Sequence, residues 1–214
     1  MIKQNENVAL FDMDGTLCDY DGQLSKDLKG LMSPGESEFS GRIDKAPDYV
    51  KRRADILRSS QDWWKNLPKL QLGWDVLEIA QELDYRIMIL TQGPRKNPSA
   101  WTGKKLWIDE KLGQDVDITI TRDKGLVYGK ILVDDFPEYA ERWLTWRKNG
   151  LVIMPVNKSN EDYSHRQVIK YDGTNLEEVR HAMTERLRTG HGADQILDKA
   201  GQILRKAERS KVRT

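Results

Sequence analysis

The chain has 214 residues, of which 38% are hydrophobic and 32% charged, a composition typical of a globular rather than a disordered protein. Its formal net charge of +1 argues against a dedicated polyanion binder, and a single cysteine, Cys18, excludes a disulfide framework. No stretch is apolar enough for a signal peptide or approaches the roughly 20 apolar residues that cross a bilayer. We therefore expect a cytoplasmic protein with no membrane partner.

Five short apolar runs predict the strands of a parallel sheet. They are rich in Ile, Val and Leu and lack polar alternation, as expected of strands covered on both faces. The runs are residues 8–11, 86–90, 118–121, 130–133 and 151–156. Segments with helical spacing lie between them; in residues 73–85, for example, Val76, Leu77 and Ala80 share one face. This alternation predicts an α/β fold with a doubly wound parallel sheet.

Residues 18–73 interrupt the alternation of strands and helices. Two polar, helix-like stretches there, 21–32 and 48–67, flank a loop-prone segment. We interpret residues 18–73 as a helical cap inserted after the first strand. The core would then consist of residues 1–17 and 74–190, with one further helix near 175–188 and another near 193–209. Residues 191–214 form a basic tail, for which we expect a solvated helix, with nucleic-acid contact as the alternative.

Chemically active side chains follow four of the expected strands. Asp12 and Asp14 follow the first strand, Thr91 the second, Lys124 the third, and Asp134 and Asp135 the fourth. Because the carboxyl ends of parallel strands meet at one edge of the sheet, these side chains should lie together. Carboxylate oxygens suit Mg²⁺, while a lysine and a hydroxyl suit a phosphate group. The pattern predicts a site for a magnesium ion and a phosphate ester.

Most of these residues also have a purely structural interpretation. Thr91 alone could be a turn residue, Lys124 alone a solvated lysine, and the Asp134–Asp135 pair a helix cap. The pair Asp12 and Asp14 is harder to explain in this way, because two neighbouring acids without a cation repel each other. Their common position at the strand ends favours a functional site.

The residues "DMDGTL" (12–17), Thr91, Lys124 and "DD" (134–135) resemble the haloacid dehalogenase-like superfamily of phosphotransferases, in the order of that family. The resemblance implies that Asp12 is the nucleophile that forms an aspartyl-phosphate. It implies that Asp14 protonates the leaving alcohol and then deprotonates the attacking water. It further implies a Mg²⁺ cofactor held by Asp12, by the Asp14 backbone carbonyl and by Asp135 or Asp134, with Asp135 preferred.

Two longer stretches narrow this resemblance. Residues 89–113, "ILTQGPRKNPSAWTGKKLWIDEKLG", and 118–135, "ITITRDKGLVYGKILVDD", are similar to the 5′(3′)-deoxyribonucleotidase family. That similarity implies an aromatic base pocket and a set of phosphate-binding residues. The pocket would contain Tyr20, Trp63 and Trp64, although helix packing is the alternative for the two tryptophans. Besides Lys124 and Thr91, the phosphate would contact Lys104 or Lys105, and Gln92.

Gln92 and Phe136 depart from the family pattern. Gln92 stands where the family has a small serine, and Phe136 stands where the family often has an arginine.

Taken together, the sequence predicts a hydrolase: a magnesium-dependent phosphomonoesterase that acts on a small phosphate ester. The preferred substrate is a nucleoside monophosphate. A sugar phosphate is the alternative substrate, and a nucleotide- or nucleic-acid-binding module on the same fold is the third interpretation. A homodimer is left open.

Overall fold

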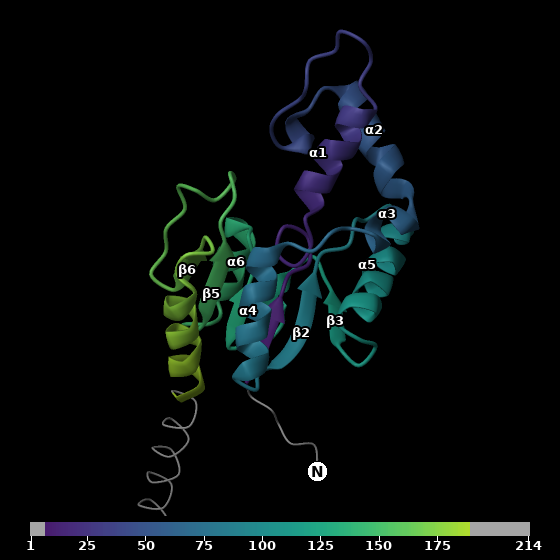
Figure 1. Cartoon of the computed structure of the whole chain (residues 1–214). Helices are drawn as coiled ribbons and strands as arrows, with labels where there is room; N and C mark the ends of the chain where they lie inside the picture. Colours follow the sequence, from purple (N-terminus) through teal and green to yellow (C-terminus); the bar gives the residue numbers. More distant parts are fainter. Residues whose placement is uncertain (1–6, 189–214) are drawn as a thin grey trace, which may run out of the picture.

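The computed structural model describes residues 7–188 and contains one six-stranded parallel sheet (Figure 1). Its strands are β1 (Val8–Phe11), β2 (Arg86–Thr91), β3 (Asp117–Ile120), β4 (Ile131–Val133), β5 (Leu151–Pro155) and β6 (Val168–Tyr171). Their order across the sheet is β3-β2-β1-β4-β5-β6, and every neighbouring pair is parallel. The predicted α/β fold class is therefore confirmed.

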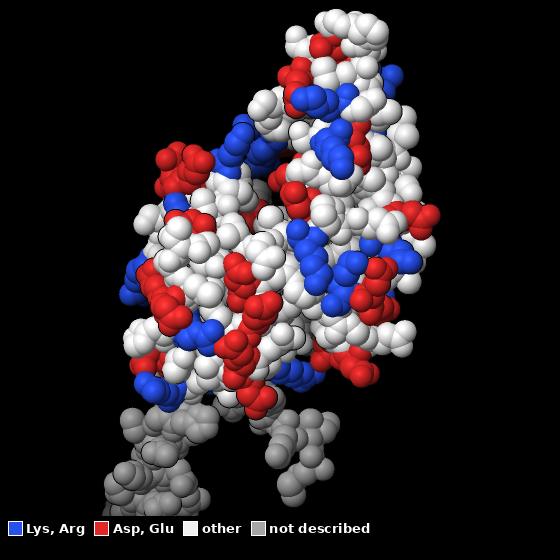
Figure 2. All heavy atoms as spheres, in the orientation of Figure 1, with Lys and Arg blue, Asp and Glu red and all other residues white. Residues whose placement is uncertain are grey.

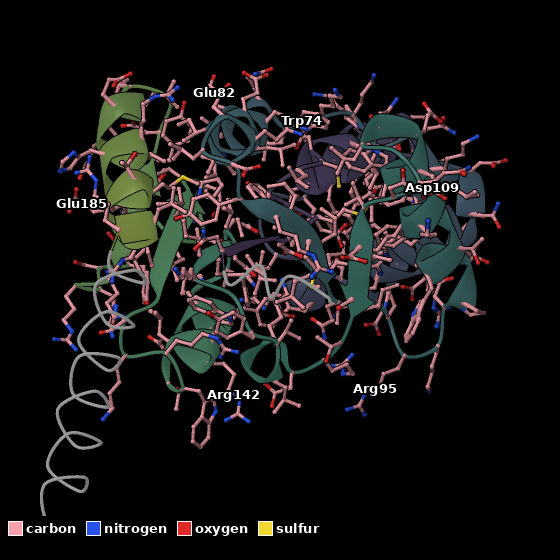
Figure 3. All side chains as sticks on the ribbon, turned by 90° about the horizontal axis from the view of Figure 1, so that it is seen from below. Trp74, Glu82, Arg95, Asp109, Arg142 and Glu185 are labelled. Atoms are coloured by element: carbon pink, nitrogen blue, oxygen red, sulfur yellow. The ribbon has the colours of Figure 1, made fainter. Side chains whose placement is uncertain are left out.

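Both faces of the sheet are covered, which explains why the strand sequences lack polar alternation. Along β1, Ala9 and Phe11 belong to one buried cluster and Val8 and Leu10 to another. The first cluster includes side chains of α4 (Gln71–Glu82), α5 (Pro98–Lys111) and the helical residues 176–188, and the second includes those of α6 (Pro137–Leu144). Figure 3 shows the two layers, with Trp74 of α4 on one side of the sheet and Arg142 of α6 on the other.

Three helices and a short 3₁₀ turn fill the long connection between β1 and β2. They are α1 (Tyr20–Gly30), η1 (Ile43–Lys45), α2 (Asp48–Ser59) and α3 (Gln61–Lys65), and they rise above the sheet in Figure 1. The predicted stretch 48–67 is split because Ser60 ends α2 and its side chain accepts a hydrogen bond from the Trp63 backbone at the start of α3. The division into cap and core stays a prediction.

The lower end of the inserted helices is packed tightly against α5. A Cβ at Gly103 of α5 would lie 2.5 Å from the Trp64 Cβ of α3, so only glycine allows this approach. The buried Trp107 indole donates to the Leu67 carbonyl at 2.7 Å. The inserted helices are therefore fixed to the sheet at the edge where β1 and β2 end.

Several predicted boundaries differ from the structure. Strand β6 was not predicted, because "VIKY" is short and includes a lysine. Helix α6 ends at Leu144, and a series of turns follows it as far as Gly150. The helix expected near 175–188 is present as residues 176–188, whereas the one near 193–209 and the basic tail lie outside the described residues. Within residues 7–188, no helix is long and apolar enough to cross a membrane.

The strand order places a crevice at the carboxyl end of β1. Strand β1 has β2 on one side and β4 on the other, so the chain winds in opposite directions from this point. Open α/β sheets bind ligands in the crevice at such a reversal. The residues that follow β1, β2 and β4 are therefore positioned around one cleft.

Candidate active site

A buried lysine joins the first and fourth strand ends. Lys124, at the start of η2 (Lys124–Leu126), places its Nζ 2.8 Å from Asp12 Oδ1 and 2.7 Å from Asp134 Oδ2. All three side chains are almost completely buried. Burial opposes a charge on Lys124, but Asp12 and Asp134 outweigh this effect and raise the pKa of the lysine. Lys124 therefore stays protonated, and with two of its three N–H groups used it has one left for a ligand.

The two acids after β4 have different surroundings. Asp134 accepts from Lys124 through one oxygen and from the Phe136 backbone at 3.0 Å through the other. Asp135 instead accepts from the Thr16 hydroxyl at 3.3 Å and from the Asn157 amide at 2.7 Å. Only Asp135 of the pair lines the cleft that holds Asp12. The geometry therefore favours Asp135 over Asp134 as a ligand for a group bound in the cleft.

The carboxylates fit a divalent cation. Asp12, Asp134 and Asp135 each offer one oxygen, and the three atoms lie within 4.8 Å of one another. Counting Asp14 and the two buried lysines, 104 and 124, the site holds four carboxylates and two ammonium groups, a formal charge of −2. Burial raises the pKa of Asp135 well above its ordinary value, and Asp134 and Asp12 add to the rise. A hard dication would relieve this repulsion.

Asp14 faces a second buried lysine, on α5. Lys104 Nζ donates to Asp14 Oδ2 at 2.6 Å, to the Thr91 hydroxyl at 2.9 Å and to the Gln92 carbonyl at 2.9 Å. These three bonds use all its donors, so Lys104 holds the ends of β1 and β2 together in this state. Burial raises the pKa of Asp14 although Lys104 opposes the rise. Asp14 thus holds a proton more readily than a carboxyl group in water does.

The turn after β1 depends on glycine in two ways. Gly15 has a φ of +74°, a left-handed conformation that side chains disfavour, and a Cβ there would lie 2.6 Å from a carboxylate oxygen of Asp135. A Cβ at Gly73, at the start of α4, would collide with the backbone carbonyl of Thr16. The loop that carries Asp12 and Asp14 is therefore confined from both sides.

The other two residues expected at the phosphate have different positions. Lys105 follows Lys104 on α5 but points away from the cleft, where it pairs with Asp109 and is 42% exposed. Gln92 lines the cleft, and in one orientation of its amide the oxygen accepts from the Arg122 guanidinium at 3.1 Å while the nitrogen donates to the Tyr139 hydroxyl. Of the two lysines expected as alternatives, Lys104 alone reaches the site.

The cleft consists of two adjoining spaces that share Asp14 and Gln92. The smaller, about 180 Å³, is also lined by Asp12, Thr91, Asp135 and Tyr139, and we call it the reaction chamber. The larger, about 690 Å³, extends between the inserted helices and the β2–α5 loop, and we call it the outer chamber. Figure 2 shows a recess below the inserted helices, with acidic and basic side chains at its rim.

The three aromatic residues of the inserted helices form one cluster but face different spaces. Tyr20 and Trp64 are stacked, with ring centroids 5.6 Å apart, and both line the outer chamber. Trp63 meets each of them edge-on and lines a separate surface hollow with Leu57, while its indole donates to Asp27 at 2.7 Å. The structure therefore brings two of the three predicted aromatics to the outer chamber, because successive helix residues point in different directions.

Sequence reasoning missed several residues of the site. Asn157 and Asn160, just after β5, donate to the side chain and backbone carbonyl of Asp135 at 2.7 and 2.8 Å. Their position past a strand end could have identified them by the same rule that found Asp12. Tyr139 and Arg58, which line the two chambers, lie within helices and had no comparable signal.

Comparisons with known proteins give weak sequence similarity and a clear similarity of fold. No protein-family model matches the chain. It is 25% identical over 139 residues to a Bordetella pertussis protein named "Putative 5′(3′)-deoxyribonucleotidase", covering 61% of this chain and 74% of the relative. A protein of the same name from Vibrio phage KVP40 is 23% identical over 135 residues, covering 62% of this chain and 68% of the relative.

Two crystal structures share the fold. A structure described as a "putative haloacid dehalogenase-like hydrolase", from Burkholderia xenovorans LB400, has a TM-score of 0.53 at 17% identity, covering 86% of this chain and 99% of its own. A HAD family hydrolase from Deinococcus radiodurans R1, with bound phosphate and sodium, has a TM-score of 0.51 at 10% identity, covering 85% and 96%. The fold is that of haloacid dehalogenase-like hydrolases, which confirms the resemblance noted in the sequence.

Proposed function

We propose that the chain is a magnesium-dependent phosphomonoesterase that works through an aspartyl-phosphate on Asp12. The observation that carries the proposal is the buried group of Asp12, Lys124 and Asp134, with Asp135 beside it, at the carboxyl end of the sheet. A binding module would have no need of a carboxyl group held by a buried lysine in the lining of a cleft. The fold of haloacid dehalogenase-like hydrolases supports the same chemistry.

The first half-reaction transfers the phosphoryl group to the protein. A carboxylate oxygen of Asp12 attacks phosphorus, the bond between phosphorus and the leaving oxygen breaks, and the proton on Asp14 passes to that oxygen. Lys124 restricts the rotation of the Asp12 carboxylate and offers its third N–H to a phosphoryl oxygen. The pKa of Asp14, raised by burial, favours the protonated form that this step requires.

The second half-reaction regenerates Asp12. Asp14, now ionised, accepts a proton from water while the water oxygen attacks phosphorus, and the bond between phosphorus and the Asp12 oxygen breaks. The products are inorganic phosphate and the original carboxylate. Lys104 donates to Asp14 at 2.6 Å and would stabilise its ionised form, so the same side chain can act first as an acid and then as a base.

Mg²⁺ would be held by the carboxylates of Asp12 and Asp135 and by the backbone carbonyl of Asp14. When bound, it would supply positive charge that lowers the repulsion between an anionic nucleophile and an anionic phosphate. Asn157 and Thr16 hold the Asp135 carboxylate in place by hydrogen bonds. Asp134 contributes indirectly, by fixing Lys124 next to the nucleophile.

We propose a nucleoside monophosphate as the substrate, with residues 18–73 acting as a cap over the leaving alcohol. The names of the sequence relatives support this choice, as does an outer chamber of about 690 Å³ beside Asp14, a size typical of small-molecule sites. A sugar phosphate is the alternative substrate for the same chemistry.

A phosphate-release screen tests the proposal. Purified protein is incubated with nucleoside monophosphates, sugar phosphates and para-nitrophenyl phosphate, each with magnesium and with a chelator. We expect release that needs magnesium and is fastest with a nucleotide. Release from sugar phosphates alone would show that the substrate is a sugar phosphate and not a nucleotide. The absence of phosphate release from every ester would refute the phosphatase proposal.

A further inference from the structure

The outer chamber is the space that receives the leaving group, if the proposed phosphatase chemistry holds. The reaction chamber takes the phosphoryl group at Asp12, and Asp14, which lines both spaces, delivers a proton to the leaving oxygen. The rest of the substrate must then extend past Asp14 into the outer chamber. The other side chains that line the outer chamber therefore decide which leaving groups are bound.

The aromatic side of the outer chamber has little ring surface to offer. Trp64 is only 2% exposed: one face stacks on Tyr20 at 5.6 Å, and the Lys104 ammonium lies 5.3 Å from its ring centroid. Its indole nitrogen is also used, since it donates to the Arg58 carbonyl at 2.7 Å. Stacking on aromatic rings alone is therefore a weak basis for recognition here.

Arg58 of α2 lines the outer chamber and is held in place by several hydrogen bonds. Its guanidinium donates to the Ala54 carbonyl at 3.1 Å, to the Tyr20 hydroxyl at 3.2 Å and to Asp55 at 2.6 Å. Its backbone carbonyl accepts from Trp64 and from the Asn97 amide. Three of the five N–H groups are thus occupied within the described residues, and two remain in a fixed orientation.

A second cation, Lys96, lies on the β2–α5 loop and lines the same space. Among the described residues no carboxylate lies within ion-pair distance of its ammonium group. Asp55 is paired with Arg58 and Asp14 with Lys104. Four charged side chains line the outer chamber, and one of them, Asp14, also belongs to the reaction chamber, where it is paired with Lys104. The other three, Arg58, Lys96 and Asp55, have a formal charge of +1, which suits an anionic group.

We propose that Arg58 and Lys96 bind a second anionic group on the leaving alcohol, a phosphate or a carboxylate. The substrate class is then a phosphate monoester with another negative charge beyond the ester oxygen, such as a nucleoside 3′,5′-bisphosphate. A preorganised guanidinium fork matches two oxygens of such a group, and a flexible lysine adds a point charge. This inference rests on the proposed phosphatase chemistry for the direction in which the substrate lies. It changes the proposed substrate from a nucleoside monophosphate to a phosphate ester that carries a second anionic group.

Binding to an inactive variant tests the inference without turnover. Calorimetry on Asp12→Asn compares a nucleoside 3′,5′-bisphosphate with the 5′-monophosphate of the same nucleoside, and 3-phosphoglycerate with glycerol 3-phosphate. We expect the compound with the extra anion to bind about tenfold more tightly in at least one pair, and salt to reduce the difference. The nucleotide pair tests a phosphate and the glycerol pair a carboxylate.

Matched variants identify the residues. On the Asp12→Asn background, Lys96→Gln should reduce the preference for the extra anion by about fivefold, as for a partly exposed ion pair. Arg58→Lys keeps the charge but loses the planar guanidinium group that can donate to two oxygens at once. It should reduce the preference for the extra anion by about tenfold. Arg95→Gln is the control: it removes the same charge one residue away, from an exposed side chain at the margin of the molecule that does not line the outer chamber (Figure 3).

Two results would overturn the inference. One is equal affinity, within about twofold, for both members of both pairs. The other is a loss of preference in Arg95→Gln as large as that in Lys96→Gln, which would indicate general charge rather than a site. Failure of the proposed function is a separate result, since it would be recognised by the absence of phosphate release from para-nitrophenyl phosphate by the wild-type protein with magnesium.

Discussion

Replacing Lys124 by methionine removes the cation that joins Asp12 and Asp134. Methionine is similar in length and apolar, so the change deletes the charge with little change of volume. In the wild-type protein the ammonium lies 2.8 and 2.7 Å from two carboxylates that are almost completely buried. The variant therefore leaves two buried acids without a counter-ion.

The expected cost is about 3–5 kcal/mol of unfolding free energy, the range found when one partner of a buried ion pair is removed. The cost depends on pH. Burial raises the pKa of Asp134 to about 7 even with Lys124 present, from an ordinary value of 3.8, and loss of the lysine raises it further. A carboxyl group with a raised pKa takes up a proton on folding, so both proteins lose stability as the pH rises from 3.8 to the pKa of folded Asp134. In the wild-type protein this loss ends at about pH 7, and in the variant it continues to a higher pH, so the deficit of the variant grows above about pH 7.

Urea denaturation followed by circular dichroism measures the effect, with a chelator present so that no divalent ion compensates. The deficit of Lys124→Met should be largest at about pH 8 and smaller at about pH 5. The double variant Lys124→Met with Asp134→Asn should recover about 2 kcal/mol or more, because it removes the uncompensated charge and keeps an acceptor for the Phe136 amide. Lys105→Met, a half-exposed lysine paired with Asp109, is the control and should cost at most about 1 kcal/mol.

A deficit below about 1 kcal/mol in Lys124→Met would refute the reasoning, since two buried carboxylates cannot lose their counter-ion at so small a cost. A deficit that grows toward acid pH would refute it as well, because the sign of the linkage would then be reversed. A double variant no more stable than Lys124→Met would show that Asp134 is not the group left unpaired.

Asp135→Asn should raise the magnesium concentration for half-maximal activity more than it raises KM, because it weakens a metal ligand; a magnesium titration with a saturating ester checks this. Tyr20→Ala removes a wall of the outer chamber and the hydroxyl that accepts from Arg58, and it should lower the ratio of nucleotide to para-nitrophenyl phosphate activity by at least about fivefold. Trp63→Ala, outside that space, should leave the ratio unchanged. Gly73→Ala should cost about 1–3 kcal/mol in thermal or urea unfolding and lower kcat, because its Cβ displaces the loop after β1; Gly30→Ala, with open space around the Cβ, should be nearly neutral. An Asp135→Asn variant with an unchanged metal requirement, a ratio that falls equally in both aromatic variants, or a fully stable Gly73→Ala would each contradict the corresponding assignment.

The strand ends were predictable because the rule that found them is local. An apolar run followed by a polar residue is visible in sequence, and a parallel sheet brings such positions to one edge whatever the strand order. Asp12, Thr91 and Lys124 were found in this way. The same rule applied to the end of β5 would have found Asn157, but a hydrogen bond to Asp135 gives no sign in the sequence.

Side-chain direction was less predictable, because it depends on packing between distant segments. Trp63 and Trp64 are adjacent in sequence, yet Trp64 lines the outer chamber and Trp63 lines the separate surface hollow. Ser60 splits the helix before them and sets their rotation about the helix axis. Arg58 was missed for a similar reason, since its role depends on Tyr20 and Asn97, which are about 40 residues away on either side.

The pairing of each lysine was also beyond sequence reasoning. Lys104 and Lys105 are chemically equivalent in the sequence, and α5 turns one into the site and the other toward solvent. Burial then decides the outcome: Lys104 is fully buried with three acceptors, while Lys105 has a single surface partner. The helix period predicts that the two differ in direction, and only the packing of α5 on α3 determines which one faces inward.

The phosphorylated state of Asp12 is the most direct test of the central claim. The protein and magnesium are mixed with a phosphate ester that has proved to be a substrate and is labelled in its phosphoryl group. The reaction is quenched in acid within one turnover. The protein is then digested and its peptides are analysed by mass spectrometry. We predict one phosphoryl group on the peptide that contains Asp12, released by hydroxylamine as an acyl-phosphate and absent in Asp12→Asn, whose turnover falls by several orders of magnitude. An unlabelled wild-type peptide together with near-normal turnover in Asp12→Asn would contradict the covalent mechanism.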